Sequence, residues 1–215
     1  MRQIFSIILI FFFSAQVGAQ NITPKYTFNM DIGLPIATGN EPFKDIMQGL
    51  LCTNIYGQYS FPFQLNVGLG MRYSLFTIDE FAINEENNGQ IHTGATFIKI
   101  GYDQFHTERF STDFGVKVGY SWNYANTDLN KVSELNHKLF TATLIEPTIG
   151  LILSADERNS YRWNVGYCIH GYGFSPSRIG LSSNAVYDVS KFGNLTNYFV
   201  VGFGYTHYFR NKTPN

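Results

Sequence analysis

Alternation of apolar and polar side chains is the dominant pattern of this chain. Between Phe110 and Tyr124 the even positions are aromatic or branched, whereas the odd positions are Gly, Ser, Asp, Lys or Asn. Successive side chains of a strand point to opposite faces of a sheet, so this segment predicts a strand with one apolar and one polar face. A helix would mix the two sets of residues.

The same alternation recurs and predicts eight strands, at about residues 25–38, 50–61, 63–76, 93–104, 109–125, 139–154, 161–171 and 196–210. Short connections near residues 62, 106–108 and 155–160 alternate with longer loops at about 39–49, 77–92, 126–138 and 172–195. Outer-membrane barrels have short periplasmic turns at one end and long external loops at the other. The pattern therefore predicts an all-β, eight-stranded antiparallel up-and-down transmembrane β-barrel over residues 20–215, with both termini in the periplasm.

The alternative with the same strand pattern is a soluble, lipocalin-type barrel, whose polar face would meet water and should be rich in Lys and Glu. The polar face here is instead rich in glycine, at Gly33, Gly68, Gly70, Gly115, Gly119, Gly150, Gly166, Gly202 and Gly204. Glycine packs little against water but suits a narrow lumen. Charged residues make up 14% of the chain, against about 25% in soluble domains. We therefore expect the polar face inside and the apolar face against lipid.

The first 19 residues predict a removable signal peptide. Arg2 supplies a positive start, residues 4–13 form an apolar core, and Ala19 ends a run of small residues. An uncleaved anchor is the alternative, but ten residues fall short of the roughly 20 that a spanning helix needs.

Aromatic residues gather where the predicted strands should cross the two membrane interfaces, as in the girdles of membrane barrels. The periplasmic girdle would contain Tyr26, Phe61, Phe63, Phe110, Tyr161, Trp163 and Phe209, and the external girdle Tyr73, Tyr120, Trp122, Tyr124 and Phe199.

The signal peptide ending in Gly18, Ala19 and Gln20, the eight alternating segments and the closing strand over residues 199–209 (FVVGFGYTHYF) resemble the small outer-membrane β-barrel family common in Bacteroidota. The likeness extends more loosely to OmpA-, OmpX- and OmpW-type barrels. It implies residence in the outer membrane, contact with its lipid and lipopolysaccharide, and insertion by the barrel-assembly machinery. Such proteins often end on an aromatic residue, whereas residues 210–215 follow Phe209 here.

Charged residues on the polar face should lie in the lumen, at Asp31, Arg72, Lys99, Asp113, Lys117, Glu146, Arg162 and His170. Buried charges are costly unless they are paired, so we expect a salt-bridged plug. A turn centred on His106 would place Lys99 opposite Asp113. A turn around Arg158 would bring Glu146 near Cys168 and His170, with Lys117 at a similar height. A gated ion path through the same residues is the alternative, although eight strands leave little bore.

Enzymatic function has a precedent in barrels resembling the lipid A palmitoyltransferase and deacylase families. His170, Ser175, Ser177 and His207 are the candidates here, but no carboxylate is spaced to orient a His toward a Ser. Metal and nucleotide motifs are missing from the sequence, so we expect no cofactor. The net charge of −1 predicts no nucleic-acid partner. Cys52 and Cys168 fall on non-neighbouring strands and are expected to be separate buried thiols.

Function should then reside in the long loops. The second loop carries the acidic residues Asp79, Glu80, Glu85 and Glu86. The fourth carries apolar residues that, if exposed, would mark a contact with another envelope protein: Phe174, Ile179, Leu181, Val186, Tyr187 and Phe192. The leading hypothesis is a non-enzymatic structural or interaction protein, such as a subunit of an envelope or secretion assembly. The alternatives are a narrow solute or ion channel and a lipid A-modifying enzyme.

Overall fold

The computed structural model describes residues 25–83, 87–107, 109–132, 139–181 and 193–209. The predicted signal peptide and the residues that follow Phe209 lie outside this part of the chain.

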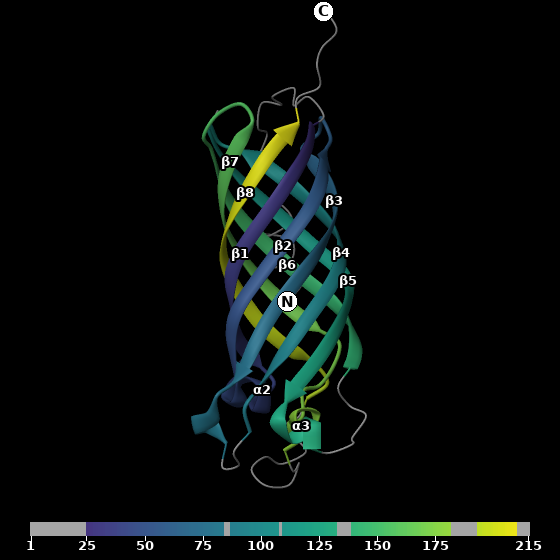
Figure 1. Ribbon diagram of the computed structural model, residues 1–215. Coiled ribbons are helices and arrows are strands. Elements are labelled where there is room, and N and C mark those ends of the chain that lie inside the picture. Colours follow the sequence, from purple (N-terminus) through teal and green to yellow (C-terminus); the bar gives the residue numbers. More distant parts are fainter. Residues whose placement is uncertain (1–24, 84–86, 108, 133–138, 182–192, 210–215) are drawn as a thin grey trace, which may run out of the picture.

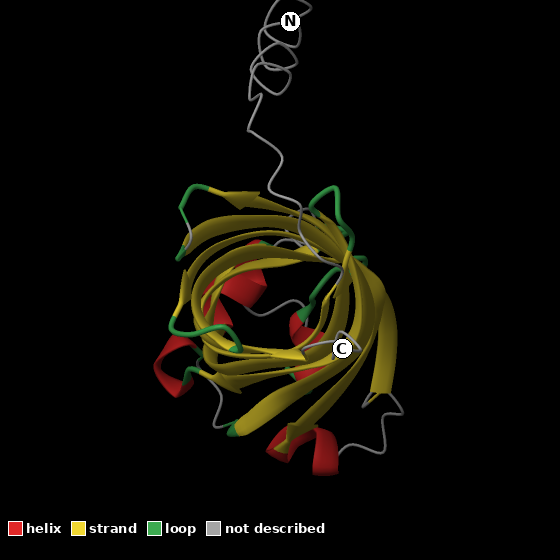
Figure 2. Ribbon diagram, turned by 90° about the horizontal axis from the view of Figure 1, so that it is seen from above, coloured by secondary structure: helices red, strands yellow, loops and turns green. Residues whose placement is uncertain are grey.

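Eight antiparallel strands close into a barrel in which each strand pairs with its neighbours in sequence and β8 pairs with β1. In Figure 1, β1 (purple) lies beside β8 (yellow), and Figure 2 shows the closed ring of strands from above. The predicted fold is confirmed. The strands are β1 (Lys25–Gly39), β2 (Met47–Ser60), β3 (Leu65–Ile78), β4 (Gly89–Phe105), β5 (Phe110–Thr127), β6 (Leu139–Ser154), β7 (Asn159–His170) and β8 (Thr196–Phe209).

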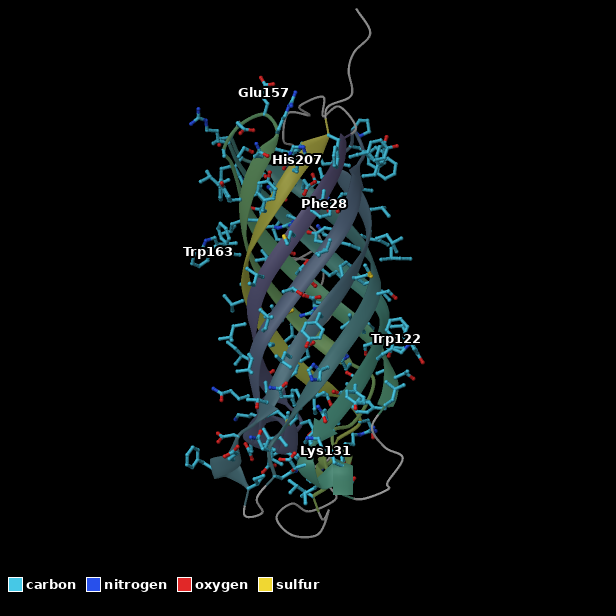
Figure 3. The ribbon with its side chains drawn as sticks, in the orientation of Figure 1. Phe28, Trp122, Lys131, Glu157, Trp163 and His207 are labelled. Carbon is cyan, nitrogen blue, oxygen red and sulfur yellow. The ribbon has the colours of Figure 1, made fainter. Side chains whose placement is uncertain are left out.

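The two rims of the barrel differ. The short connections between strands lie at one end, named here the turn rim, where Tyr26 near the start of β1 pairs with Phe209 at the end of β8. The long connections lie at the other end, the loop rim, and carry α2 (Glu41–Ile46), η1 (Glu80–Ala82), α3 (Asp128–Val132) and η2 (Pro176–Ile179). Figure 3 marks the turn rim with Glu157 and the loop rim with Lys131.

Strand pairing reaches further toward the loop rim than the alternation predicts. Met47 pairs with Ile78, and Gln90 pairs with both Thr77 and Asn126. The first three loops are correspondingly shorter, whereas the fourth keeps its predicted length. The helical turns α2, η1, α3 and η2 have no counterpart in the predicted strand pattern. Among the described residues, no helix has the length and apolar character needed to cross a membrane.

The outer wall of the barrel is apolar. Along β1 the exposed side chains are Tyr26, Phe28, Met30, Ile32, Leu34 and Ile36, and the other strands continue this surface. The inward side chains of the same strand include the buried Thr27, Asn29 and Asp31. Exposed apolar patches of this extent are rare on soluble monomers. The exterior therefore matches the lipid-facing wall of a membrane barrel and rules against the lipocalin-type alternative.

The aromatic residues that were expected in the girdles lie on this outer wall, except Phe61 and Phe63, which stack on each other in the turn between β2 and β3. All are exposed except Phe61, which is half-buried. Trp163 projects from the half of the barrel near the turn rim and Trp122 from the half near the loop rim (Figure 3). Two levels of amphipathic rings fit two membrane interfaces.

Candidate functional site: the lumen and the loop rim

One cluster of buried charges centres on Glu146 of β6. The guanidinium of Arg72 on β3 donates to the Glu146 carboxylate and, through its other terminal nitrogen, to the Cys52 sulfur at 2.9 Å. Lys117 on β5 directly opposes Glu146, with its Nζ 3.4 Å from Oε2. One carboxylate thus serves two cations, and this cluster carries an excess of positive charge.

A second cluster lies nearer the turn rim. The Oδ2 atom of Asp113 accepts from Lys99 Nζ at 2.6 Å and from Arg162 at 3.4 Å. The other terminal nitrogen of Arg162 donates to Asp31 at 3.0 Å. Lys99 also donates to Gln58 Oε1 at 3.0 Å. The structure therefore brings seven of the eight predicted lumen charges into two ion-pair clusters.

The expectation that Lys99 lies opposite Asp113 is wrong. In the β4–β5 ladder Lys99 faces Lys117, and Asp113 faces Asp103. The Lys99–Asp113 contact is diagonal and spans four residues of register, which the long lysine side chain can bridge. This diagonal contact compensates the like charges that oppose each other directly, an arrangement that is otherwise destabilising.

His170 stands apart from both clusters. Its ring lies 3.1 Å from Ser121 Oγ and 3.0 Å from the Tyr198 hydroxyl, and Leu144 rather than Glu146 opposes it in the ladder. Of the other candidates for catalysis, Ser175 and Ser177 bond each other at 2.9 Å, whereas His207 contacts Asn159. Within the described residues none of these groups forms a Ser–His–carboxylate arrangement, which nucleophilic catalysis by serine requires.

Aromatic rings fill the lumen between the charges, and the sequence analysis missed them. The Tyr56 ring lies 5.5 Å from both Lys99 Nζ and the Arg162 guanidinium carbon, within cation–π distance. The Phe97 ring lies within the same kind of distance of Lys117 Nζ, and the Tyr198 ring of the Arg72 guanidinium. All three rings fall on the inward positions of their strands, so strand parity alone could have placed them.

The loop-rim end of the lumen is closed by an apolar plug. Phe43 of α2 packs against Phe76 of β3 and against Phe174 of the fourth loop, with ring centroids 5.1 and 5.4 Å apart. Phe174 and Ile179 are fully buried, so the expectation that they form an exposed contact surface is wrong. Small inward residues such as Ala95 leave room for these larger side chains. Leu181 is half-buried against the plug, while Val186, Tyr187 and Phe192 lie outside the described residues.

Polar contacts hold the fourth loop in the mouth of the barrel. The carbonyl of Ile179 accepts from Asn87 at 2.8 Å and from Thr127 at 2.9 Å. The Arg178 guanidinium carbon lies 4.3 Å above the centre of the Phe140 ring, and burial lowers the pKa of this arginine. Burial raises the pKa of the neighbouring Tyr172, because in both side chains it disfavours the charged form. The described first part of this loop, residues 172–181, is therefore integrated into the interior.

A small cavity lies among the charges in the described part of the lumen. The cavity bounded by Asp31, Tyr56, Lys117, Glu146 and Arg162 has a volume of about 20 Å³, enough for a water molecule but not for a solute path. Cys52 and Cys168 are free, buried thiols. Among the described residues, no group of three or more His, Cys, Asp or Glu side chains is arranged to hold a metal.

Outside the plug, the loop rim presents a fully exposed phenyl ring, Phe81 of η1. Asp79 caps this turn by accepting from the Phe81 backbone nitrogen at 3.1 Å. The four long loops together carry nine acidic and five basic residues in sequence. The rim therefore combines an accessible aromatic side chain with an excess of negative charge.

No protein-family model matches the chain, and no curated protein does either. Among solved structures, it is similar to Neisserial surface protein A (NspA), with 10% identity, coverage of 87% of this chain and 100% of NspA, and a TM-score of 0.52. A major outer membrane protein of Thermus thermophilus gives 10% identity, 87% and 100% coverage, and a TM-score of 0.48. Ail of Yersinia pestis, solved with the heparin analogue sucrose octasulfate, gives 10% identity, coverage of 86% of this chain and 97% of Ail, and a TM-score of 0.47. At this identity the likeness to NspA shows a shared fold: the chain folds as a small eight-stranded outer-membrane β-barrel.

Proposed function

We propose that this protein resides in a bacterial outer membrane as a non-enzymatic structural or interaction protein that exposes its loop rim at the cell surface. The closed lumen is the observation that carries the proposal. Within the described residues, ion pairs and aromatic rings fill the middle of the barrel and the apolar plug fills its loop-rim end, which argues against transport through the lumen. What remains accessible is the rim itself.

In this arrangement the turn rim and both termini face the periplasm, and the apolar wall contacts outer-membrane lipid and lipopolysaccharide. Insertion would use the barrel-assembly machinery, for which Phe209 in the closing strand is the expected signal. The same closing strand supports a place in the small-barrel family of Bacteroidota. The excess of acidic residues on the loops favours an envelope partner with a basic or neutral surface over a polyanion such as a sulfated glycan.

Topology can be tested by cysteine labelling, because Cys52 and Cys168 are buried and give little background. Phe81→Cys places a thiol on the loop rim, and Phe63→Cys places one on an equally apolar, exposed position at the turn rim. On intact cells a membrane-impermeant maleimide should label the first variant, and the second only after the outer membrane is permeabilised. The opposite pattern would refute the orientation.

Channel function is tested by conductance in planar bilayers. The purified barrel should conduct no more than empty bilayers do, because the cavity among the lumen charges holds only about a water molecule. Stable single-channel currents would overturn the proposal.

The interaction role is tested by a photo-crosslinking amino acid at position 81, with position 63 as the matched control. A defined adduct should form in cells only from position 81, and Phe81→Ser should remove the same protein from gently extracted complexes. Purification from native membranes without any partner, together with a Phe81→Ser strain that behaves as wild type, would contradict it.

A further inference from the structure

The outer wall of the barrel carries two imidazoles on an otherwise uncharged surface. At the outward positions of β1 to β8, none of the described residues is Asp, Glu, Lys or Arg. His92 lies near the start of β4, close to the loop rim, and His207 lies near the end of β8, close to the turn rim (Figure 3). Side chains that can carry charge are costly against hydrocarbon, so on such a wall they indicate a polar partner at the level of the lipid headgroups.

Two tyrosines hold the His92 ring in place. The Tyr73 hydroxyl lies 2.7 Å from His92 Nδ1, and Tyr124 opposes His92 directly in the β4–β5 ladder. The centroid of the imidazole lies 6.1 Å from that of the Tyr73 ring and 6.4 Å from that of the Tyr124 ring. The second ring nitrogen, Nε2, has no hydrogen-bond partner among the described residues. The imidazole is thus fixed at one nitrogen and available to a ligand at the other.

An open notch lies beside His92 on the same face of β4. Gly94 is the next outward residue after His92, and a Cβ atom at this glycine would meet no other atom within 4 Å. Tyr73 on β3 and Trp122 on β5 directly oppose Gly94 in the two ladders. Their side chains are 37% and 43% exposed. The notch, which Tyr73, His92, Gly94 and Trp122 form together, therefore has two aromatic sides and one imidazole at its end.

A second open glycine on the outer wall has different neighbours. Gly57 on β2 also has no atom within 4 Å of a Cβ position, but Phe28 and Leu69 oppose it. Phe28 lies in the half of the barrel near the turn rim, whereas Trp122 lies in the half near the loop rim (Figure 3). The opening at Gly57 is thus lined by apolar groups, and the notch by aromatic side chains with polar tips. Such side chains favour the depth of the headgroups over that of the acyl chains.

We propose that the notch binds the phosphorylated sugar headgroup of lipopolysaccharide, with His92 Nε2 donating to a phosphate oxygen and the sugar lying between Tyr73 and Trp122. Hydrogen bonds to a phosphate are charge-assisted and stronger than neutral ones. The outward positions of β3, β4 and β5 carry no described carboxylate that would repel an anion, so the charge of the wall is compatible with this occupant. The inference rests on the proposed orientation, in which the loop rim and the notch face the outer leaflet.

The experiment uses the mature barrel with Trp163→Phe, which leaves Trp122 as its one tryptophan, in a maltoside detergent that contains no phosphate. The barrel is titrated with lipid A, with lipid A whose phosphates have been removed, and with phosphatidylglycerol. Binding is followed by Trp122 fluorescence and by calorimetry. Lipid A should bind saturably and at least about tenfold more tightly than its dephosphorylated form, which lacks the charged acceptor. Phosphatidylglycerol has a phosphate but no sugar and should also bind more weakly than lipid A.

Two pairs of matched variants test the residues of the notch. His92→Gln should weaken lipid A binding about tenfold, and His92→Arg should restore it, because arginine also donates to phosphate. His207→Gln, the same change near the turn rim, should leave binding unchanged. Gly94→Val should fill the notch and weaken binding at least about tenfold, whereas Gly57→Val fills the other open position and should have no effect. Valine favours strands, so both glycine variants should fold.

Three results would overturn the site. One is equal affinity for lipid A with and without its phosphates. Another is lipid A binding that neither His92→Gln nor Gly94→Val weakens, because lipid would then cover the wall without a specific contact. The third is equally tight binding of phosphatidylglycerol, or displacement of lipid A by inorganic phosphate, since either would indicate a site for any phosphate.

Failure of this site is distinct from failure of the proposed function, because binding in detergent does not depend on orientation. A barrel that is labelled from outside at position 81 but does not bind lipid A refutes the site alone. A barrel that binds lipid A but is labelled from outside at position 63 refutes the proposed orientation.

Discussion

Replacing Glu146 with Gln should lower the free energy of unfolding by about 3–5 kcal/mol. Glu146 touches Arg72 and lies 3.4 Å from Lys117, and these three side chains are at most 5% exposed. At an effective dielectric constant of about 20 each contact contributes roughly 4 kcal/mol. The substitution also removes the cost of desolvating the Glu146 carboxylate, which offsets several kcal/mol of this loss. The net loss of stability is the cost of leaving Arg72 and Lys117 buried without an anion between them.

The assay is urea unfolding of the barrel refolded into lipid vesicles, followed by the fluorescence of Trp122 and Trp163. Asp128→Asn is the matched control, because its 2.8 Å ion pair with Lys131 is about 60% exposed and should contribute less than about 0.5 kcal/mol. A loss below about 1 kcal/mol for Glu146→Gln would refute the reasoning, since it would mean that water enters the lumen and screens the cluster.

A combined variant distinguishes charge from shape. Arg72→Met, Lys117→Met and Glu146→Leu together remove the whole cluster at similar volume. Apolar replacement of a complete buried cluster is often neutral or stabilising. The triple variant should therefore be more stable than Glu146→Gln alone, and a triple variant that unfolds more easily would show that the lumen needs these charges to fold.

Two further predictions concern the lumen wall and the turn rim. Gly166→Ala should cost about 1–3 kcal/mol in the same assay, because its Cβ would overlap Glu146 Oε1; Gly57→Ala, where the Cβ meets no atom within 4 Å, should change stability by less than about 0.5 kcal/mol. The pKa of Asp156 is lowered, chiefly by the hydrogen bond from the Asn159 side chain. The folded pKa thus lies below the unfolded value of about 3.9, so the stabilisation is complete at neutral pH and is lost as the pH falls through the folded pKa. Asp156→Asn should flatten only this acid limb of the stability profile, and an unchanged limb would contradict the assignment.

Side-chain alternation was sufficient to predict the number of strands, their order and the face of each residue. Lys117 and Glu146 fall on inward positions, and Trp122 and Trp163 on outward ones, because the period of a strand is two residues regardless of what lies beyond it. The same rule would have placed Tyr56 in the lumen. It was missed because the prediction for the lumen considered only glycines, charged residues and cysteines, and Tyr56 is none of these.

Register could not be predicted in this way. The β4–β5 ladder pairs Phe105 with Ser111, whereas a turn centred on His106 would pair it with Thr107, so the observed partner lies four residues later. Moving a turn centre by one residue shifts the pairing by two, and even shifts leave the inward and outward sets unchanged. Alternation therefore cannot detect the difference. The like-charged pairs of Lys99 with Lys117 and of Asp103 with Asp113 are visible only in the folded ladder.

The prediction that Phe174 and Ile179 are exposed on the fourth loop was wrong for a different reason. Whether Phe174 and Ile179 are exposed depends on the volume at the barrel mouth, which residues far away in sequence determine. Ala95, Ala125 and Ala142 all point inward near the loop rim and belong to the same apolar cluster. Small inward residues on several strands at one height could have signalled an occupant, since protein interiors are packed without large voids.

The lumen is divided between the ion-pair clusters and the apolar plug, and this division determines which parts of the surface can change without loss of stability. The ion pairs link β1, β3, β4, β5, β6 and β7 across the interior, so a change in one of them disturbs the whole wall. The plug depends on a few apolar side chains and on contacts such as the one from Asn87 to the Ile179 carbonyl, outside the strand ladders. Residues beyond the plug, such as the exposed Phe81, contribute to neither. We therefore expect substitutions there to leave the stability of the barrel unchanged. Under the proposed function, such substitutions could change the partner at little cost to folding.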